Sequence, residues 1–379
     1  MSQHLAASYN SPNPNWGPTI VAVHDNGYID FGIVFNGTFT WFAAMQSQLS
    51  NPYLPGSPTL NTLLYNQENN IFVAGDNQGN IWVADGNGDL DNWNRANLPS
   101  YVLDSVKAIA YGKRSTDGQG VFVASGDIQN YPTIYSFDGQ NWSHPNQTMP
   151  VVRVTINDII FANGMFVGVG MYLEASGIFY SIDGVTWTTA QGLSGSATFS
   201  AITYANNLFV AVAQSSTIWY SSDGKNWTIA TGLSGEANFN DVTYANNTFV
   251  AVADEGTIWW SPDGKQWTIA NEIPPDGPDI TFTKVAFAAG QFVAVADVGD
   301  REVIPIYYSP DGKNWLQGQH IYYGGSYWGY PPFYDVIYAN NTFYAIQRAA
   351  YQPGQTSSAW GPYSSTDGVT WHRNYYSPG

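Results

Sequence analysis

Two stretches of this chain are nearly identical, and their spacing constrains the fold more than any other feature. Residues 199–235 read FSAITYANNLFVAVAQSSTIWYSSDGKNWTIATGLSG, and residues 239–270 read FNDVTYANNTFVAVADEGTIWWSPDGKQWTIA. The stretches start at 199 and 239, so their offset is 40 residues. Repeat lengths of about 40 to 50 residues are typical of chains built from stacked four-stranded β-units.

The end of this unit recurs along the chain. A D-G-x-x-W pattern closes repeats at Trp142, Trp187, Trp227, Trp267, Trp315 and Trp371, and a degenerate version closes one at Trp93. We therefore count seven full repeats. The composition agrees with a turn-rich β protein, because 11% charged residues, 16% aromatic residues, 38 Gly and 21 Pro do not suit a helical bundle or a disordered chain.

Each repeat reads as four short strands. In the repeat that ends at Trp267, strands are expected at 241–245, 249–253, 257–261 and 266–270. The pair Asn246-Asn247 predicts a tight turn between the first two strands, since Asn tolerates positive φ. The second strand is apolar throughout, which indicates burial on both faces between neighbouring sheets.

A ring of such sheets buries the faces that one sheet leaves open and exposes only short edges. We predict an all-β fold, a seven-bladed β-propeller of four-stranded antiparallel blades. It forms a single domain over residues 19–379, after an N-terminal arm at 1–18. The full repeats span about 61–96, 105–144, 156–190, 199–230, 239–270, 282–317 and 333–376. Residues 20–31 also align loosely with 249–260, so eight blades with a partial N-terminal blade is the alternative.

The turn between the third and fourth strands of each repeat has the most regular residues. It reads S-x-D-G at 136–139, 181–184, 221–224, 261–264, 309–312 and 365–368. This pattern resembles the Asp-box, or bacterial neuraminidase repeat, family in a form one residue shorter, over about residues 61–376. The Asp can accept backbone N–H bonds in its own turn, Gly supplies positive φ, and Trp fills the space between blades. The resemblance implies a structural role for these residues, on the face away from any functional site.

The opposite face is the expected ligand-binding surface, because its loops vary in length while the Asp-box turns do not. The connection after Trp315 contains QHIYYGGSYWGYPPFYD, whose aromatic rings could stack on sugars and offer hydroxyl hydrogen bonds. Packing at the top of the ring is the alternative reading. The proposed aromatic contacts are Tyr322, Tyr323, Tyr327, Trp328, Tyr330, Tyr334, Trp360 and Tyr172.

Acidic residues mark two further candidate sites. Aligned positions at the start of the first strands hold Asp158, Asp241 and Asp335, together with Lys284. They could bind a cation or polar ligand, or be solvated strand ends. Asp85, Asn87, Asp89 and Asp91 have the alternating oxygen side chains of a calcium loop, although Leu90 stands where an EF-hand has glycine. A solvated acidic turn is the alternative there. No other cofactor is expected.

The sequence contains few of the patterns that are typical of catalytic sites. The Asp-box resemblance raises the possibility of a sialidase, a family that holds its substrate with three arginines. This chain has only six arginines in total and no Arg-Ile-Pro segment, so a sialidase is not favoured. It also has no H-E-x-x-H pair and no G-x-S-x-G elbow. A two-carboxylate glycoside hydrolase stays open, because its acids are paired in space rather than in sequence. We expect a protein that is not an enzyme.

The function predicted from these features is recognition. We expect a lectin-like propeller that binds a glycan or glycoprotein, with a protein-interaction scaffold, such as a virulence, toxin-complex or assembly factor, as the alternative. A net charge of −17 disfavours nucleic acid and anionic membrane surfaces as partners, and no membrane insertion is expected. The first residues show no basic and apolar signal pattern, which predicts a cytoplasmic protein or one exported by a non-classical route.

Overall fold

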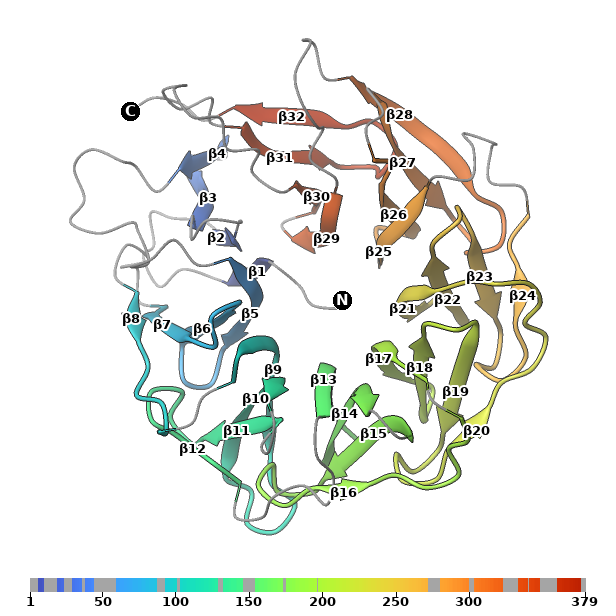
Figure 1. The fold of residues 1–379 in the computed structure, drawn as a ribbon. Helices are drawn as coiled ribbons and strands as arrows, with labels where there is room; N and C mark the ends of the chain where they lie inside the picture. Colours follow the sequence, from blue (N-terminus) through green and yellow to red (C-terminus); the bar gives the residue numbers. More distant parts are fainter. Residues whose placement is uncertain are drawn as a thin grey trace.

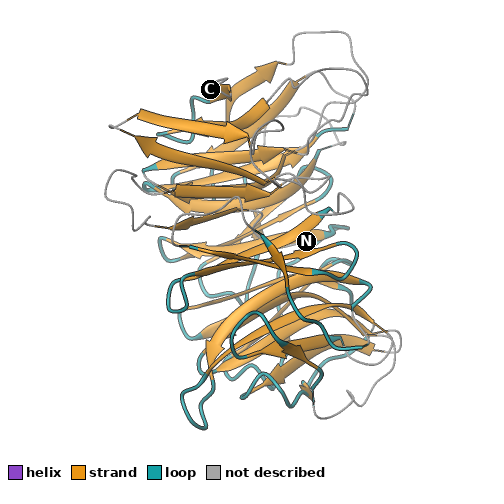
Figure 2. Ribbon diagram, turned by 90° about the vertical axis from the view of Figure 1, so that its left-hand side faces the viewer, coloured by secondary structure: helices purple, strands orange, loops and turns teal. Residues whose placement is uncertain are grey.

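The computed structural model of this protein describes most of the chain. The backbone is described at 6–9, 19–23, 29–35 and 38–43. Beyond these strands, the described residues are 59–86, 93–100, 103–128, 132–145, 154–172, 175–195, 197–271, 280–299, 303–322, 333–339, 341–347 and 360–375. Every regular element within them is a β-strand, as Figure 2 shows. None of them is a helix that could cross a membrane.

The strands form a ring of antiparallel meanders (Figure 1). We number these meanders as blades 1 to 8 in chain order. Blade 1 contains β1 (Ala6–Tyr9), β2 (Thr19–Val23), β3 (Ile29–Phe35) and β4 (Thr38–Ala43). Blade 2 contains β5 (Leu60–Asn66), β6 (Ile71–Asp76), β7 (Ile81–Asp85) and β8 (Asn94–Arg95). Blade 3 contains β9 (Ser105–Lys113), β10 (Gly120–Ile128), β11 (Thr133–Ser136) and β12 (Trp142–Ser143). Blade 4 contains β13 (Val154–Ala162), β14 (Met165–Tyr172), β15 (Ala175–Ser181) and β16 (Thr188–Thr189).

The second half of the ring repeats this order. Blade 5 contains β17 (Phe199–Ala205), β18 (Leu208–Ala213), β19 (Thr217–Ser221) and β20 (Thr228–Ile229). Blade 6 contains β21 (Phe239–Ala245), β22 (Thr248–Ala253), β23 (Ile258–Ser261) and β24 (Thr268–Ile269). Blade 7 contains β25 (Thr281–Ala288), β26 (Gln291–Asp297), β27 (Val303–Ser309) and β28 (Leu316–Tyr322). Blade 8 contains β29 (Phe333–Ala339), β30 (Thr342–Gln347), β31 (Trp360–Ser365) and β32 (His372–Tyr375).

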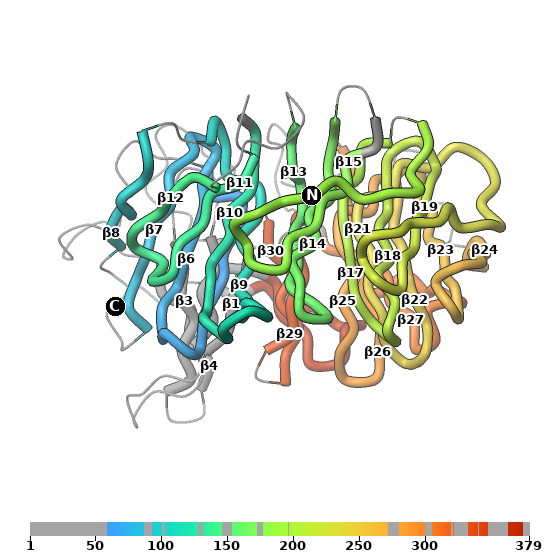
Figure 3. The backbone as a smooth tube through the Cα atoms, turned by 90° about the horizontal axis from the view of Figure 1, so that it is seen from below, coloured from blue at the N-terminus to red at the C-terminus, as the bar shows by residue number. Residues whose placement is uncertain are grey.

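The first strand of each blade lies nearest the ring axis, and these inner strands follow one another in a closed cycle. β1 lies beside β5 on one side and beside β29 on the other. Blades 3 and 4 are also joined by backbone pairing of β10 with β13, so they form one eight-stranded sheet. Seen from the side, the strands run between the two faces of the ring (Figure 3). The fold is an all-β propeller.

The predicted number of seven blades is not confirmed, because the described strands form eight four-stranded meanders. The additional one is blade 1, in the segment where the sequence left a partial eighth blade as the alternative. The loose alignment of 20–31 with 249–260 is correct in register, since Val21 pairs with Phe31 as Val250 pairs with Trp260. Blade 1 lacks the S-x-D-G turn, which we call the Asp-box turn for its sequence pattern alone, because only Asn36 and Gly37 separate β3 from β4.

The core lies between adjacent blades. All residues of β18 and β22 are buried, as their unbroken apolar runs predicted. Neighbouring blades share the same hydrophobic clusters. The second strand of a blade, such as β18, therefore packs against the sheets on both sides. The turn at Asn246 and Asn247 has positive φ at both residues, 48° and 58°, which confirms the predicted tight hairpin. Its Asn246 amide donates to the carbonyl of Pro310 in the next Asp-box turn, so both kinds of turn lie on one face.

Candidate functional site at the bulges of the inner strands

Each inner strand of blades 2 to 8 carries a bulge near its start. In blade 6, Phe239 pairs with Ala253 and Asp241 with Val252, so Asn240 has no partner in the ladder. The residues in this bulged position are Asn61, Lys107, Asn157, Ser200, Asn240, Thr283 and Tyr334. A bulge redirects a side chain, and bulges are common at barrel rims and beside functional sites. These residues therefore define a ring of side chains around the axis.

The bulged side chains connect neighbouring blades. The side-chain amides of Asn157 and Asn240 each donate to a backbone carbonyl of the next inner strand, that of Phe199 and that of Phe282, both at a distance of 2.8 Å. The Thr283 hydroxyl donates to the carbonyl of Phe333 at 2.7 Å, and the Asn61 amide donates to that of Val106 at 2.9 Å. At these four positions the bulge therefore supplies a hydrogen bond across the blade interface.

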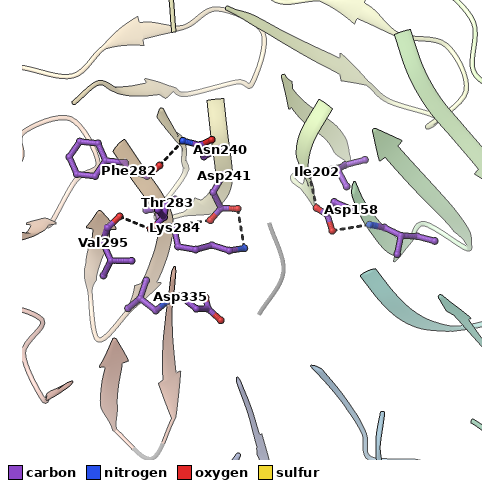
Figure 4. Close-up of polar contacts among 12 residues, drawn as sticks. Asp158, Ile202, Asn240, Asp241, Phe282, Thr283, Lys284, Val295 and Asp335 are labelled. Carbon is purple, nitrogen blue, oxygen red and sulfur yellow. Dashed lines mark hydrogen bonds and ion pairs between the residues drawn. The ribbon is translucent and has the colours of Figure 1, made fainter. Parts of the chain in front are cut away.

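The predicted carboxylates directly follow three of these bulges (Figure 4). Oδ2 of Asp158 accepts the backbone N–H of Ile202 in the next blade at 2.9 Å, and Oδ2 of Asp241 accepts that of Val285 at 3.1 Å. Asp158 and Asp335 also accept the N–H of the residue that follows them, at 2.8 and 2.9 Å. All three are buried. Their bonds show a structural role, and contact with a ligand remains a prediction.

Lys284 and Asp241 form a buried ion pair across the interface between blades 6 and 7. The Lys284 Nζ lies 3.6 Å from Oδ1 of Asp241, and their side chains are 2% and 9% exposed. Figure 4 shows the two side chains pointing toward each other. Breaking such a pair is strongly destabilising because it leaves an uncompensated buried charge. Within the described part of the chain, no three His, Asp or Glu residues gather closely enough to hold a metal ion.

The predicted aromatic contacts are only partly within the described structure. Tyr323, Tyr327, Trp328 and Tyr330 lie outside the described residues. Tyr322 ends β28, Trp360 begins β31, and Tyr334 is the half-buried bulge residue of β29, so these three belong to blades 7 and 8. Tyr172 ends β14 in blade 4, on another side of the ring (Figure 1). The structure therefore does not bring Tyr172 together with the other aromatic residues.

The predicted calcium hairpin is likewise described at one residue only. Asp85 is exposed at the end of β7, while Asn87, Asp89 and Asp91 lie outside the described residues. The calcium site stays a prediction.

Asp76, which sequence reasoning missed, organises the turn before β7. This buried carboxylate accepts hydrogen bonds from the backbone N–H of Gln78 and Asn80. It also accepts them from the Asn80 amide at 2.8 Å and the Trp82 indole at 2.9 Å. Equivalent positions in blades 5 and 6 hold Ala213 and Ala253, so comparing repeats could have marked Asp76 as different.

The Asp-box turns on the opposite face are closed by their own hydrogen bonds. In blade 5, Oδ1 of Asp223 accepts the Ser221 hydroxyl and the backbone N–H groups of Lys225 and Asn226, at 2.8 to 2.9 Å. Trp227 is buried and donates its indole N–H to the carbonyl of Gly224 at 3.1 Å. Partial burial raises the pKa of Asp223, but the bonds from Asn226 and Lys225 outweigh it and hold the pKa well below its usual value. These observations agree with the expected structural role.

Comparison with known proteins identifies the fold. No protein-family model and no curated protein sequence matches the chain. The computationally designed protein Ika8 has a TM-score of 0.60 at 12% identity, and the match covers 99% of this chain and 98% of that one. The C-terminal WD40 domain of Sif2 has a TM-score of 0.60 at 11% identity, covering 90% and 92%. YCF48 bound to D1 peptide has a TM-score of 0.52 at 15% identity, covering 78% and 91%. The likeness is one of fold, and it shows that the chain is similar to β-propellers.

Proposed function

We propose that this chain is a non-catalytic recognition scaffold that binds a protein or peptide on the face opposite the Asp-box turns. The proposal rests on one observation: the charged side chains of the inner strands already bond to partners within the protein. Asp158, Asp241 and Lys284 bond to backbone groups or to each other across blade interfaces. They hold the ring together, and the loops that vary between blades are left to contact a partner.

Similar structures support a peptide or protein partner. The structure of YCF48 holds a D1 peptide, and that protein is similar to this chain over 78% of the chain's length. A net charge of −17 favours partners with a basic contact face, since complementary charge speeds encounter and opposes wrong pairings.

A glycan is the second candidate, and the aromatic sequence YYGGSYWGY at 322–330 favours it. Rings of Tyr and Trp suit sugar stacking as well as peptide contacts. Tyr322, Trp328, Tyr330 and Trp360 are the residues we assign to the contact in either case.

Binding with the full chain separates the two candidates. A partner captured by cross-linking would be purified and titrated by calorimetry against the wild type and Trp328→Ala. We expect at least a tenfold weaker Kd for the variant, as found for aromatic interface anchors. Trp260→Ala is the control, because Trp260 lies half-buried on β23 of blade 6, beneath Lys313, which follows the S-x-D-G turn of blade 7.

A glycan array with the same three proteins completes the test. Sugar binding that Trp328→Ala removes would establish the glycan reading. Protein binding that Trp328→Ala leaves unchanged would contradict the proposed surface.

A further inference from the structure

The first and last blades of the ring are neighbours, because β1 lies beside β29, and Asp335 belongs to β29. We propose that the Asp335 carboxylate accepts a hydrogen bond from the backbone N–H of Ala6, and that this bond is the latch that closes the ring between blade 8 and blade 1. The inference concerns the fold and does not depend on the proposed ligand.

The interface that closes the ring, between blades 8 and 1, is not made by a strand from one end of the chain completing the sheet at the other end. Each sheet consists of strands from one continuous stretch of sequence, and blade 1 is complete in β1–β4. No pairing among the described strands joins blade 1 to blade 8, although β1 lies beside β29. Packing and individual side-chain bonds must therefore hold this interface.

Two other interfaces show what an aspartate does at this position. Asp158 and Asp241 each follow the bulge of their inner strand, as Asp335 does. Each bonds to the N–H of a residue 44 positions later, Ile202 and Val285. Asp335 is 0% exposed, and its Oδ1 accepts the N–H of the next residue, as that of Asp158 does. Its other oxygen is therefore equivalent to the Oδ2 that reaches the next blade from Asp158.

The register of blade 1 identifies the donor. Ile202 pairs with Ala211, the alanine of a Phe-Val-Ala run, and Val285 pairs with Ala294, the alanine of another. In blade 1 the corresponding run is Ile20-Val21-Ala22, and Ala22 pairs with Ala6. The N–H of Ala6 thus occupies the position of the N–H groups that Asp158 and Asp241 bind.

Burial makes this bond important for closure. A fully buried carboxylate is costly unless donors surround it, and bonds to a charged acceptor are stronger than those between neutral groups. A bond from β1 would add a second backbone donor to the N–H of Val336, which Asp335 already accepts. The same bond would fix the N-terminal strand against blade 8.

Amide-resolved hydrogen exchange on the full chain tests the latch with a matched pair of variants. In Asp335→Ala we expect the Ala6 amide to exchange at least tenfold faster than in the wild type, with Ile202 unchanged. In Asp158→Ala the reverse holds, and Ile202 exchanges faster while Ala6 does not. An unchanged Ala6 rate in folded Asp335→Ala, or an equal response of Ala6 to both variants, overturns the proposal.

Asp335→Asn covers the case in which Asp335→Ala does not fold. The asparagine keeps one oxygen acceptor but loses the charge, so the Ala6 amide should exchange a few-fold faster in an otherwise native protein. No acceleration at Ala6 in this variant also overturns the latch.

Discussion

Positive φ angles at single residues decide how the first two strands turn in blades 4 to 7. Asn206 and Asn207 have φ of 51° and 57°, and Asn163 has φ of 51° before Gly164. In blade 7 the position equivalent to Asn163 is Ala289, with φ of 50° before Gly290. Left-handed backbone costs alanine about 1–2 kcal/mol, and asparagine adopts it more readily because its side chain can bond locally. Ala289 is therefore a strained residue in a turn for which blades 4, 5 and 6 use asparagine.

Replacing this alanine should stabilise the protein. We expect Ala289→Asn to raise the free energy of unfolding by up to about 1 kcal/mol, and the reciprocal Asn163→Ala to lower it by about as much. Urea denaturation followed by tryptophan fluorescence measures both. Both positions are exposed, so packing contributes little. Changes of the same sign in the two variants would contradict the strain argument.

At the scale of the blade, the Asp-box turn of one sheet packs onto the second strand of the sheet before it. A Cβ added at Gly264 would lie 2.8 Å from Cδ2 of Leu208 and 2.9 Å from Cγ2 of Val210. Gly264 also has φ of 72°. Glycine is thus needed there for two reasons, the backbone angle and the close approach of the neighbouring blade.

A pair of glycine variants separates these reasons. Gly235 has φ of 83° and nothing within 4 Å of an added Cβ, so Gly235→Ala should cost about 1–2 kcal/mol through backbone strain alone. Gly264→Ala should cost about 1–3 kcal/mol more, because it also overpacks the blade interface. Chemical denaturation of both variants gives the difference. Equal losses would show that the interface adapts to the extra methyl group.

For the whole molecule, the Asp-box carboxylates make stability sensitive to acid. Burial raises the pKa of each carboxylate, but the hydrogen bonds of the turn lower it by more than burial raises it. Each pKa therefore lies below the ordinary 3.8 in the folded state. The six residues are Asp138, Asp183, Asp223, Asp263, Asp311 and Asp367. A carboxylate with a lowered folded pKa contributes stability that is complete above the unfolded value and is lost as the pH falls through the folded value.

We therefore expect the free energy of unfolding to fall steeply below about pH 4, as protonation of these carboxylates favours the unfolded chain. Thermal melts from pH 7 to pH 2 measure the slope. A variant with Asp223→Asn and Asp263→Asn should be less stable at pH 7 and lose less stability on acidification. A slope identical to that of the wild type would show that other groups govern the acid response. Glu236→Gln, at an exposed position, is the control.

The number of blades is also a property of the whole ring. Deleting residues 1–45 removes blade 1 and leaves β5 and β29 without the strand that lies between them. We expect the shortened chain to lose its cooperative thermal transition, or to melt at least roughly 10 °C lower, because the exposed faces of blades 2 and 8 lose their packing. Calorimetry of both chains measures this. A shortened chain as stable as the full one would support a closed ring of seven blades.

Much of the fold follows from local sequence. The period of the repeats, the asparagine turns and the apolar second strands are short-range patterns. They predict a four-stranded meander, which the structure confirms. Blade 1 does not follow from the repeat pattern, because its sequence differs from that of the other blades. A two-residue link replaces the Asp box, so the D-G-x-x-W pattern that marked the other repeats is missing.

The candidate site could be located from the sequence only as a set of positions. Aligning repeats placed Asp158, Asp241 and Asp335 at the start of the inner strands, and the structure puts them there. Their partners are on other blades, 44 residues away for Asp158 and Asp241. Such pairings depend on the bulge, which turns each carboxylate toward the next strand, and no short-range pattern predicts a bulge here.

The sequence by itself determined the repeating unit, because strand period, turn residues and burial on both faces are set by neighbours within about 40 residues. Only the tertiary structure decided how many units close the ring and what the inner carboxylates do. Both depend on contacts between blades. The ring closes where β1 meets β29, and the buried carboxylates take N–H donors that adjacent sheets bring within reach.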